Sequence, residues 1–152
     1  MMGGMTKIFD WPPLWLALFL AVAWGISALL PMPVFGRFGD VLGGALVLLG
    51  FGLMGLAAGE MLRARTTVVP RRQARQLVTS GLFRLSRNPI YLGDSLILLG
   101  ACLWLDTAPA LLLVPLFIWV INTRFITGEE AHLRQAFGTE YENYCAAVRR
   151  WV

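Results

Sequence analysis

Residues 41–59 read Val41-Leu-Gly-Gly-Ala-Leu-Val-Leu-Leu-Gly-Phe-Gly-Leu-Met-Gly-Leu-Ala-Ala-Gly59 and contain no charged side chain. A helix of about 20 apolar residues crosses the hydrocarbon core of a bilayer, which is about 30 Å thick. Two other uncharged stretches, residues 11–36 and 107–123, have comparable lengths, and residues 90–105 carry only two strongly polar side chains. None of these runs alternates strictly between apolar and polar residues, so they favour membrane-spanning helices over the strands of a barrel.

The composition supports the same fold class. Hydrophobic residues make up 57% of the 152 residues and charged residues 14%, whereas soluble domains average about 45–50% and about 25%. A small soluble domain cannot bury so much apolar surface, and disorder needs low hydrophobicity and high charge. We therefore expect one all-α domain, residues 1–152, folded as a polytopic membrane helix bundle. Its predicted parts are four transmembrane helices at residues 12–31, 41–62, 89–105 and 108–126, a cytosolic loop at 63–88, and amphipathic helices in a cytosolic tail at 127–152.

The basic residues predict the orientation of this bundle. Lys7, seven arginines between residues 63 and 87, and four arginines from Arg124 onward would all lie on one side of the membrane, leaving only Arg37 on the other. The positive-inside rule then places both termini and the 63–88 loop in the cytoplasm. We expect residence in a bacterial inner membrane. Topology and anionic lipid already account for arginines beside membrane helices, so nucleic acid is not an expected partner.

Few residues suit metal or disulfide chemistry. The two cysteines, Cys102 and Cys145, suggest no disulfide framework. His132 is the single histidine, so no multi-histidine metal site is expected. The sequence also has no glycine-rich phosphate motif and no Ser–His–Asp set. Taken from these features alone, the chain is a membrane bundle with an organised cytosolic face.

Two features at the start of the 89–105 helix can be explained either by local helix structure or by a functional site. Asn88 suits an N-cap and Pro89 the first helical position, which would make this dipeptide simply a helix start. Asp94 follows about 7 Å further along the axis. An acid near a helix N-terminus is stabilised by the helix dipole, yet ionisable residues at membrane depth usually face a bundle interior or a wet cavity. Both readings of Asp94 stay open.

The tail after residue 126 has the pattern of two short helices. Thr127 with Glu130, and Thr139 with Glu142, each fit a capping box. Gly138 suits the end of the first helix. In the second helix an apolar face with helical spacing is formed by Tyr141, Tyr144, Cys145, Val148 and either Trp151 or Val152. Such an amphipathic helix would lie at the membrane surface or close over the bundle.

Two blocks of sequence, separated by the length of two membrane helices, resemble the integral-membrane methyltransferase superfamily, which includes the phospholipid N-methyltransferases and the isoprenylcysteine carboxyl methyltransferases. The residues that carry the resemblance are Thr66-Thr67-Val68-x-Pro70, Leu77-Val78-Thr79-Ser80-Gly81-x-Phe83-Arg84-x-Ser86-Arg87-Asn88-Pro89-x-Tyr91-x-Gly93, and Glu129-Glu130-x-x-Leu133-x-x-x-Phe137-Gly138-x-x-Tyr141-x-x-Tyr144-x-x-x-Val148-x-Arg150-Trp151. The resemblance covers roughly residue 61 to the C-terminus.

This resemblance implies transfer of a methyl group from S-adenosylmethionine, bound at the cytosolic ends of the third and fourth helices. Glu129 and Glu130 match the family's cofactor-binding glutamates, and carboxylates suit the cofactor's ammonium and ribose hydroxyls. The cofactor carboxylate would pair with Arg87, with Arg84 as the alternative. The stretch that lines the cofactor pocket in the family is matched by Asn88, Tyr91 and Gly93, of which Gly93 would allow close approach of the ligand to the backbone.

The acceptor implied by the resemblance is a lipid or lipid-modified molecule in the membrane. Asn88 stands where isoprenylcysteine enzymes usually have histidine, which favours a phospholipid amine headgroup. An amine must lose a proton, and we assign this catalytic task to Asp94 and Glu130, with a water path as the alternative. We assign Arg84, Tyr141 and Tyr144 to substrate binding. The alternatives are carboxyl methylation of an isoprenylated cysteine or a similar lipophilic thiol or acid, and a non-catalytic anchor that binds anionic lipid through the arginines of residues 63–88.

Overall fold

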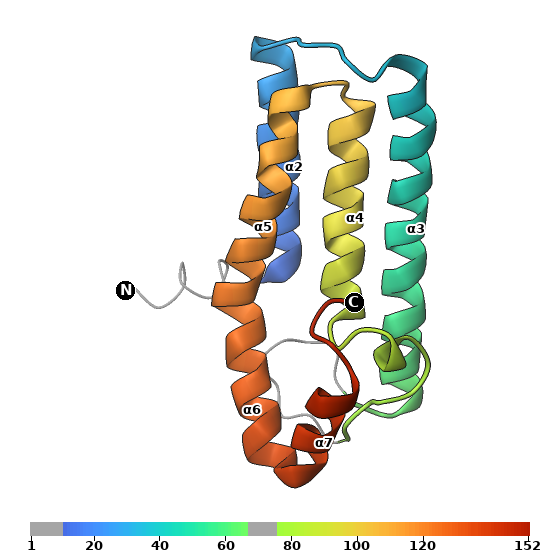
Figure 1. Cartoon of the computed structure of the whole chain (residues 1–152), viewed down its shortest axis with the longest axis vertical. Helices are drawn as coiled ribbons and strands as arrows, with labels where there is room; N and C mark the ends of the chain where they lie inside the picture. Colours follow the sequence, from blue (N-terminus) through green and yellow to red (C-terminus); the bar gives the residue numbers. More distant parts are fainter. Residues whose placement is uncertain (1–10, 67–75) are drawn as a thin grey trace.

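The computed structural model describes residues 11–66 and 76–152, and within these ranges the chain is helical without strands. Four helices, α2 (Pro12–Leu29), α3 (Gly36–Arg63), α4 (Pro89–Trp104) and α5 (Leu113–Ile121), run lengthwise through the molecule, with α4 between α3 and the pair α2 and α5 (Figure 1). Lys7, the stretch Thr67-Val68-x-Pro70 and the loop arginines Arg71, Arg72 and Arg75 lie outside the described residues. The all-helical prediction is confirmed for the described part of the chain.

Helix α3 begins at Gly36, five residues before the predicted start, and so contains Arg37 and Asp40. The reason is a cap from a distant residue. Asp106, in the turn after α4, accepts hydrogen bonds from the backbone N–H groups of Val34 (2.8 Å), Phe35 (2.6 Å) and Gly36 (3.1 Å). These N–H groups have no partner within the helix, and a carboxylate at this end is stabilised by the helix dipole.

The predicted break between a membrane helix and a tail helix at Thr127 is wrong. Helix α5 passes through a π-helical segment, Asn122–Ile126, directly into α6 (Thr127–Phe137). The hydroxyl of Thr127 donates to the carbonyl oxygen of Thr123 (3.1 Å) instead of capping a new helix. Because Phe125 and Ile126 are buried in the bundle, the chain stays helical where it packs. Gly138, with φ +51°, ends α6 as predicted.

Helices α3 and α4 approach each other through glycines. A Cβ on Gly43 would lie 2.5 Å from the carbonyl oxygen of Gly100, and one on Gly50 would lie 2.6 Å from that of Gly93. Small residues at such positions let two helix backbones come into contact, which is a common way for membrane helices to associate. Gly93 therefore brings α4 against α3, and the close approach expected of a ligand at this residue is made by a helix.

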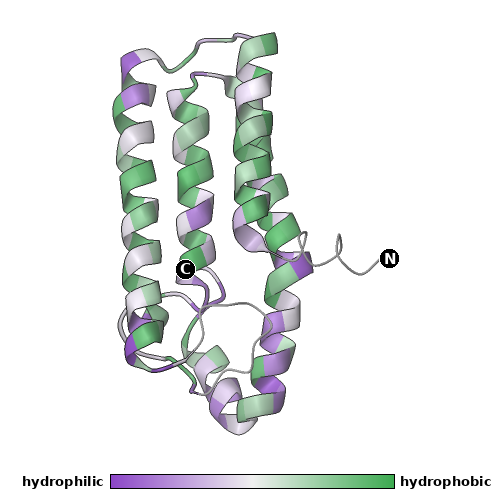
Figure 2. Cartoon of the chain, turned by 180° about the vertical axis from the view of Figure 1, so that it is seen from behind, coloured by the Kyte–Doolittle hydropathy of each residue, from purple (hydrophilic) through white to green (hydrophobic). Residues whose placement is uncertain are grey.

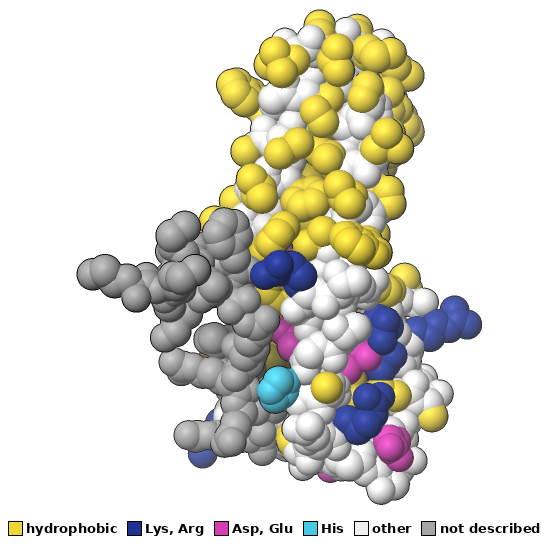
Figure 3. All heavy atoms as spheres, turned by 90° about the vertical axis from the view of Figure 1, so that its left-hand side faces the viewer, with side chains coloured by type: hydrophobic (Ala, Val, Ile, Leu, Met, Phe, Trp, Pro, Cys, Tyr) yellow, Lys and Arg dark blue, Asp and Glu magenta, His cyan; other side chains and the backbone are white. Residues whose placement is uncertain are grey.

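The apolar surface of the molecule matches residence in a membrane. Three helical stretches are long and apolar enough to cross a bilayer, namely Pro12–Leu29, Gly36–Arg63 and Ala108–Phe137, where the last begins with the 3-10 helix Ala108–Leu112. Helix α4 is apolar but has 16 residues. Hydrophobic residues dominate the bundle in Figure 2, and Figure 3 shows charged side chains gathered at one end of the molecule. The chain is thus an integral membrane protein, and most charged side chains of its described residues lie toward one end of the bundle.

Buried side chains form two clusters along the bundle. The larger one lies among α2, α4 and α5 and includes Phe19, Leu98, Phe117 and Ile121. The second is built from Ala57 of α3, Phe83 of the 3-10 helix Gly81–Arg84, and Tyr141 and Tyr144 of α7 (Thr139–Ala147). The face of α7 that carries the two tyrosines thus packs over the 3-10 helix and α3, while Glu140, Glu142 and Asn143 of that helix are exposed. In the sequence, the polar residues of the candidate site lie between residues that belong to these two clusters.

Candidate active site

The first residues of α4 are held by the last residues of the chain. Asn88 precedes the helix and Pro89 takes its first position, as predicted, but the Asn88 side chain makes no capping bond. Its Nδ2 instead donates to the carbonyl oxygen of Arg150 (3.0 Å), and the hydroxyl of Ser86 donates to the same oxygen (3.4 Å). The Ser86 hydroxyl also accepts from the backbone N–H of Asn88 (3.1 Å). The start of α4 therefore depends on a segment some sixty residues away in sequence.

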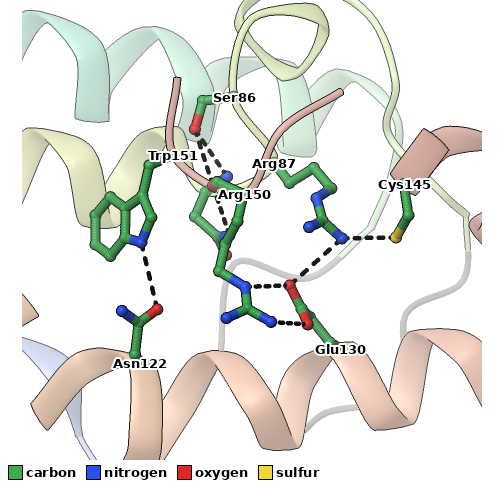
Figure 4. Close-up of polar contacts among 8 residues, drawn as sticks. Ser86, Arg87, Asn122, Glu130, Cys145, Arg150 and Trp151 are labelled. Carbon is green, nitrogen blue, oxygen red and sulfur yellow. Dashed lines mark hydrogen bonds and ion pairs between the residues drawn. The ribbon is translucent and has the colours of Figure 1, made fainter. Parts of the chain in front are cut away.

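That segment is residues 148–152, which we call the C-terminal strap. It follows α7, and Val148 has an extended backbone. The carbonyl oxygen of Arg149 accepts from the backbone N–H of Arg87 (3.0 Å). The indole Nε1 of Trp151 donates to Oδ1 of Asn122 in the π-helical segment (3.3 Å). The strap thus lies between the α4 start and the α5–α6 helix (Figure 4).

A buried carboxylate with two arginines forms the charged centre of the site. The Glu130 residue is 8% exposed, and its Oε1 and Oε2 accept from Nε (2.9 Å) and Nη2 (2.7 Å) of Arg150. Nη1 of Arg87 lies 3.4 Å from Oε1 (Figure 4). The hydrogen bonds that Arg150 donates to Glu130 raise the pKa of Arg150, and the negative charge of Glu130 raises this pKa further. Two guanidinium groups against one carboxylate leave one net positive charge at the centre.

Arg87 has further contacts that suit it to ligand binding. Its Nη1 also donates to the sulfur of Cys145 (2.6 Å), while its Nε is buried and has no hydrogen-bond partner. A buried donor without a partner is costly to leave unpaired. The Nε–H group is thus a site at which an acceptor oxygen would be stabilised.

A further contact between the two sequence blocks is made by Tyr91 and Glu129. The Tyr91 hydroxyl, on the first turn of α4, donates to Oε1 of Glu129 on α6 (2.8 Å). The Tyr91 ring lies 6.4 Å from that of Phe125, between ring centroids. Unlike Glu130, Glu129 is partly exposed. The structure therefore brings together Arg87, Asn88, Tyr91, Glu129 and Glu130, which sequence reasoning had assigned to one site.

Asp94 lies three residues, or about one helical turn, beyond Tyr91 on α4. Its side chain is buried at 2% exposure, and its Oδ1 has no hydrogen-bond partner. Helical spacing puts it near the face of Tyr91 and Leu98, which belong to the larger apolar cluster. Because this carboxylate lies inside the bundle, the structure favours an Asp94 that faces the bundle interior over one that only stabilises the helix dipole.

The three residues assigned to substrate differ in their exposure and contacts. Arg84 is exposed on the 3-10 helix. Tyr144 donates its hydroxyl to the carbonyl oxygen of Phe83 (2.6 Å), and burial raises its pKa to about 12. Tyr141 is 1% exposed beneath the guanidinium of Arg134, and burial raises its pKa as well. Both tyrosines pack in the second cluster, so a substrate role for them stays a prediction.

The sequence alone assigned no binding or catalytic role to Ser86, Asn122, Cys145, Arg150 or Trp151. Arg150 and Trp151 close the second sequence block, and that position was the available signal. Ser86 belongs to the first block and Cys145 to the apolar face of the tail helix, but neither position indicated its partner, because the contacts of Ser86, Asn122 and Cys145 join segments that are 29 to 64 residues apart.

Comparison with known proteins shows similarity to a family of membrane methyltransferases. The sequence profile of the phospholipid methyltransferase family matches residues 38–140. An uncharacterized protein of Haemophilus influenzae is 48% identical over 63 residues, which is 41% of this chain and the full length of that protein. No solved structure matches significantly.

Named enzymes are among the more distant relatives. Protein-S-isoprenylcysteine O-methyltransferase of Schizosaccharomyces pombe is 38% identical over 68 residues, covering 45% of this chain and 29% of that enzyme. A probable protein-S-isoprenylcysteine O-methyltransferase of Oryza sativa is 32% identical over 108 residues, covering 64% and 56%. The chain therefore spans between about a third and about half of the length of these methyltransferases.

Proposed function

Because the chain belongs to the phospholipid methyltransferase family, we propose that it transfers a methyl group from S-adenosylmethionine to an acceptor held in the membrane. One observation carries the proposal. The two sequence blocks that resemble methyltransferases meet at the polar end of an apolar bundle, where Tyr91 bonds Glu129 at 2.8 Å. A water-soluble donor and a lipophilic acceptor can both reach such a place.

The residues at this end fit the proposed donor by their chemistry. S-adenosylmethionine has a carboxylate, an ammonium group, ribose hydroxyls and a positively charged sulfur. The unpaired Nε of Arg87 suits the carboxylate, because a guanidinium binds carboxylates with two parallel hydrogen bonds. Glu129, which is partly exposed, suits the ammonium group or the ribose hydroxyls. Asn88 and Tyr91 add an amide and a hydroxyl at the same place.

The contacts of the two glutamates indicate different roles for Glu129 and Glu130. Glu130 has both oxygens bonded to Arg150, and Arg87 also faces it. Because both oxygens of this carboxylate already contact guanidinium groups, Glu130 orients the arginines in our proposal. Glu129 then makes the direct contact with the donor. The catalytic role first assigned to both Asp94 and Glu130 belongs to Asp94 alone.

Alignment is the main catalytic contribution that we assign to the protein. When bound, S-adenosylmethionine would supply a methyl group on a sulfonium sulfur, which departs as a neutral thioether as the acceptor's electron pair forms the new bond. Arg87, Asn88 and Glu129 would hold the donor in one orientation, and the apolar bundle would exclude water. Positioning of two reactants can lower a barrier by about 7–11 kcal/mol.

The acceptor that we propose first is a phospholipid amine headgroup. An ammonium group must lose a proton before its nitrogen can attack, and Asp94 offers a buried carboxylate with an unpaired Oδ1 for that proton. The family profile that matches residues 38–140 is that of phospholipid methyltransferases. Asp94 would act as the general base, and the exposed Arg84 would face the headgroup phosphate.

The second candidate acceptor is the carboxylate of an isoprenylated cysteine or a similar lipophilic acid. The names of the yeast and rice relatives favour it. A carboxylate is already a nucleophile, so this reaction needs no base, and Asp94 would then be dispensable.

The experiment uses the purified chain in liposomes with radiolabelled S-adenosylmethionine and either phosphatidylethanolamine or farnesylcysteine as acceptor. We expect label in the lipid phase. Mild alkali releases the label as methanol from a methyl ester but not from an N-methyl amine, so the product identifies the acceptor. Absence of label with both acceptors and with total lipid extract would contradict the proposal. Salt-sensitive binding to anionic liposomes would then favour the non-catalytic anchor.

The placement in the membrane is also part of the proposal. We propose that α4 crosses the bilayer together with the three longer spans, so that four helices cross and both termini lie in the cytoplasm of a bacterium, at its inner membrane. The test is the labelling of single introduced cysteines, in a chain without Cys102 and Cys145, by a membrane-impermeant maleimide. Residue 140 should be labelled only after lysis and residue 35 in intact cells. The reverse pattern would contradict this orientation.

A further inference from the structure

Arg150 contacts α6 with its guanidinium group and the start of α4 with its backbone carbonyl oxygen. Its guanidinium holds Glu130 on α6 through two hydrogen bonds of 2.9 and 2.7 Å. Its carbonyl oxygen accepts from Nδ2 of Asn88 (3.0 Å) and from the hydroxyl of Ser86 (3.4 Å) at the start of α4. The segments 86–88 and 129–130 therefore meet at a single residue near the end of the chain.

The rest of the strap fixes Arg150 in place. On one side, the carbonyl oxygen of Arg149 accepts from the N–H of Arg87 (3.0 Å). On the other, Trp151 is partly buried against the larger apolar cluster and donates to Asn122 (3.3 Å). With both neighbours anchored, the backbone of Arg150 is held beside Glu130 and the start of α4. Figure 4 shows the strap between the two halves, with the guanidinium directed at the carboxylate.

The geometry points to Arg150 as a positioning residue for donor binding, an inference that rests on the proposed function. A guanidinium that bonds two carboxylate oxygens in parallel fixes the plane of the carboxylate as well as its position. When Glu130 is held in that plane, its Oε1 lies 3.4 Å from Nη1 of Arg87. This ion pair keeps the Arg87 side chain directed toward the site. Arg150 thus sets the orientation of Arg87 through Glu130, and the orientation of Asn88 through its own carbonyl oxygen.

Arg149 provides a matched control. It has the same charge and lies in the same strap, but its side chain is exposed and its contact with Arg87 uses the backbone carbonyl. Arg149→Ala therefore removes one positive charge from the strap and leaves the contacts of Arg150 in place. Arg150→Lys is a second variant that keeps the charge at residue 150 but cannot bond both oxygens in parallel.

The first measurement needs no ligand. Hydrogen–deuterium exchange of the detergent-solubilised protein is followed by mass spectrometry in peptides that span residues 86–91 and 127–133. Arg150→Ala should exchange faster than the wild-type chain in both peptides, since the strap has lost its bonds to α6. Arg149→Ala should match the wild type. Unchanged exchange in the 86–91 peptide of Arg150→Ala would overturn the inference.

The second measurement separates positioning from a loss of folded protein. In steady-state assays, Arg150→Ala should raise the KM for S-adenosylmethionine at least about tenfold, since tenfold corresponds to about 1.4 kcal/mol of lost binding. Its kcat at saturating donor should change much less, and Arg150→Lys should show a smaller rise in KM. A lower kcat with unchanged KM, as expected when only part of the protein is folded, would overturn the inference. If the wild-type chain turns over no donor, the proposed function fails, while the exchange data still decide whether Arg150 positions both segments.

Discussion

The carboxylate of Glu60 occupies the space that a side chain on Gly81 would need. A Cβ atom built on Gly81 would overlap Oε1 of Glu60, and the same oxygen accepts from the backbone N–H of Leu82 (3.2 Å). The last turns of α3 are thereby attached to the 3-10 helix Gly81–Arg84. On its other side, this helix is held by the Tyr144 hydroxyl through the carbonyl oxygen of Phe83. The segment that leads to Arg87 is therefore fixed between α3 and α7.

This relationship predicts different costs for two glycines with the same backbone conformation. Gly81 has φ +54° and Gly36 has φ +53°, but nothing lies within 4 Å of a Cβ on Gly36. Gly36→Ala should lower the free energy of unfolding by about 1–2 kcal/mol, the cost of a left-handed conformation. Gly81→Ala should cost clearly more, because the Glu60 carboxylate must also move. Chemical denaturation in detergent measures both, and equal losses for the two variants would contradict the clash with Glu60.

A second prediction concerns the contact between α3 and α4. A Cβ on Gly93 would lie 2.7 Å from the carbonyl oxygen of Gly50, whereas a Cβ on Gly55 would meet nothing within 4 Å. Gly93→Ala should destabilise the protein by about 1–3 kcal/mol, as overpacking does. Gly55→Ala should be neutral or stabilising, because alanine favours the helix. Thermal unfolding measures both variants. If Gly93→Ala is as stable as Gly55→Ala, the helices do not meet at this glycine.

The cap on α3 predicts a dependence of stability on pH. Hydrogen bonds from the N–H groups of Phe35 and Val34 lower the pKa of Asp106 in the folded state. The stabilisation is therefore fully present above the pKa of the unfolded chain, which is about 3.9, and is lost as the pH falls through the lower, folded-state pKa. Between pH 5 and about pH 3, the wild type should lose more thermal stability than Asp106→Asn. Equal losses of thermal stability in Asp106→Asn and in the wild type over this range would contradict the cap.

The proposed role of Asp94 predicts a dependence on the acceptor. Asp94→Asn keeps the size of the side chain but removes the proton acceptor, and general-base catalysis contributes about 10²–10⁴-fold. Methylation of an amine should fall by about that factor, while methylation of a carboxylate should be nearly unchanged. Ser95→Ala removes a neighbouring buried hydroxyl, which donates to the Tyr91 carbonyl oxygen (2.9 Å), and is the control. Full amine methylation by Asp94→Asn would exclude Asp94 as the base.

Much of the helical architecture could be predicted from where charges are absent. The uncharged stretch 11–36 contains all of α2, and Pro89 marks the first residue of α4. The early start of α3 could not be predicted, since its cap comes from Asp106, some seventy residues away in sequence. The continuous helix through Thr127 was also missed. Local capping signals favoured a break there, but burial of Phe125 and Ile126 favours the uninterrupted helix.

The candidate site was predictable as a set of residues and less so as a set of contacts. The resemblance brought together Arg87, Asn88, Tyr91, Glu129 and Glu130, and the structure places them at one end of the bundle. It could not reveal that Glu130 is paired with Arg150, because this bond forms only when the strap folds back over α6. The resemblance also placed Gly93 against a ligand, whereas Gly93 packs against Gly50 of α3.

The most direct test of the central claim is isothermal titration of the purified chain with S-adenosylhomocysteine, the demethylated form of the proposed donor. We predict measurable heat for the wild type, and at least about tenfold weaker binding for Glu129→Ala, which loses a charge-assisted contact. Glu140→Ala, at an exposed glutamate of α7, should bind as the wild type does. Absence of binding to the wild type, or equal affinities of Glu129→Ala and the wild type, would contradict the account.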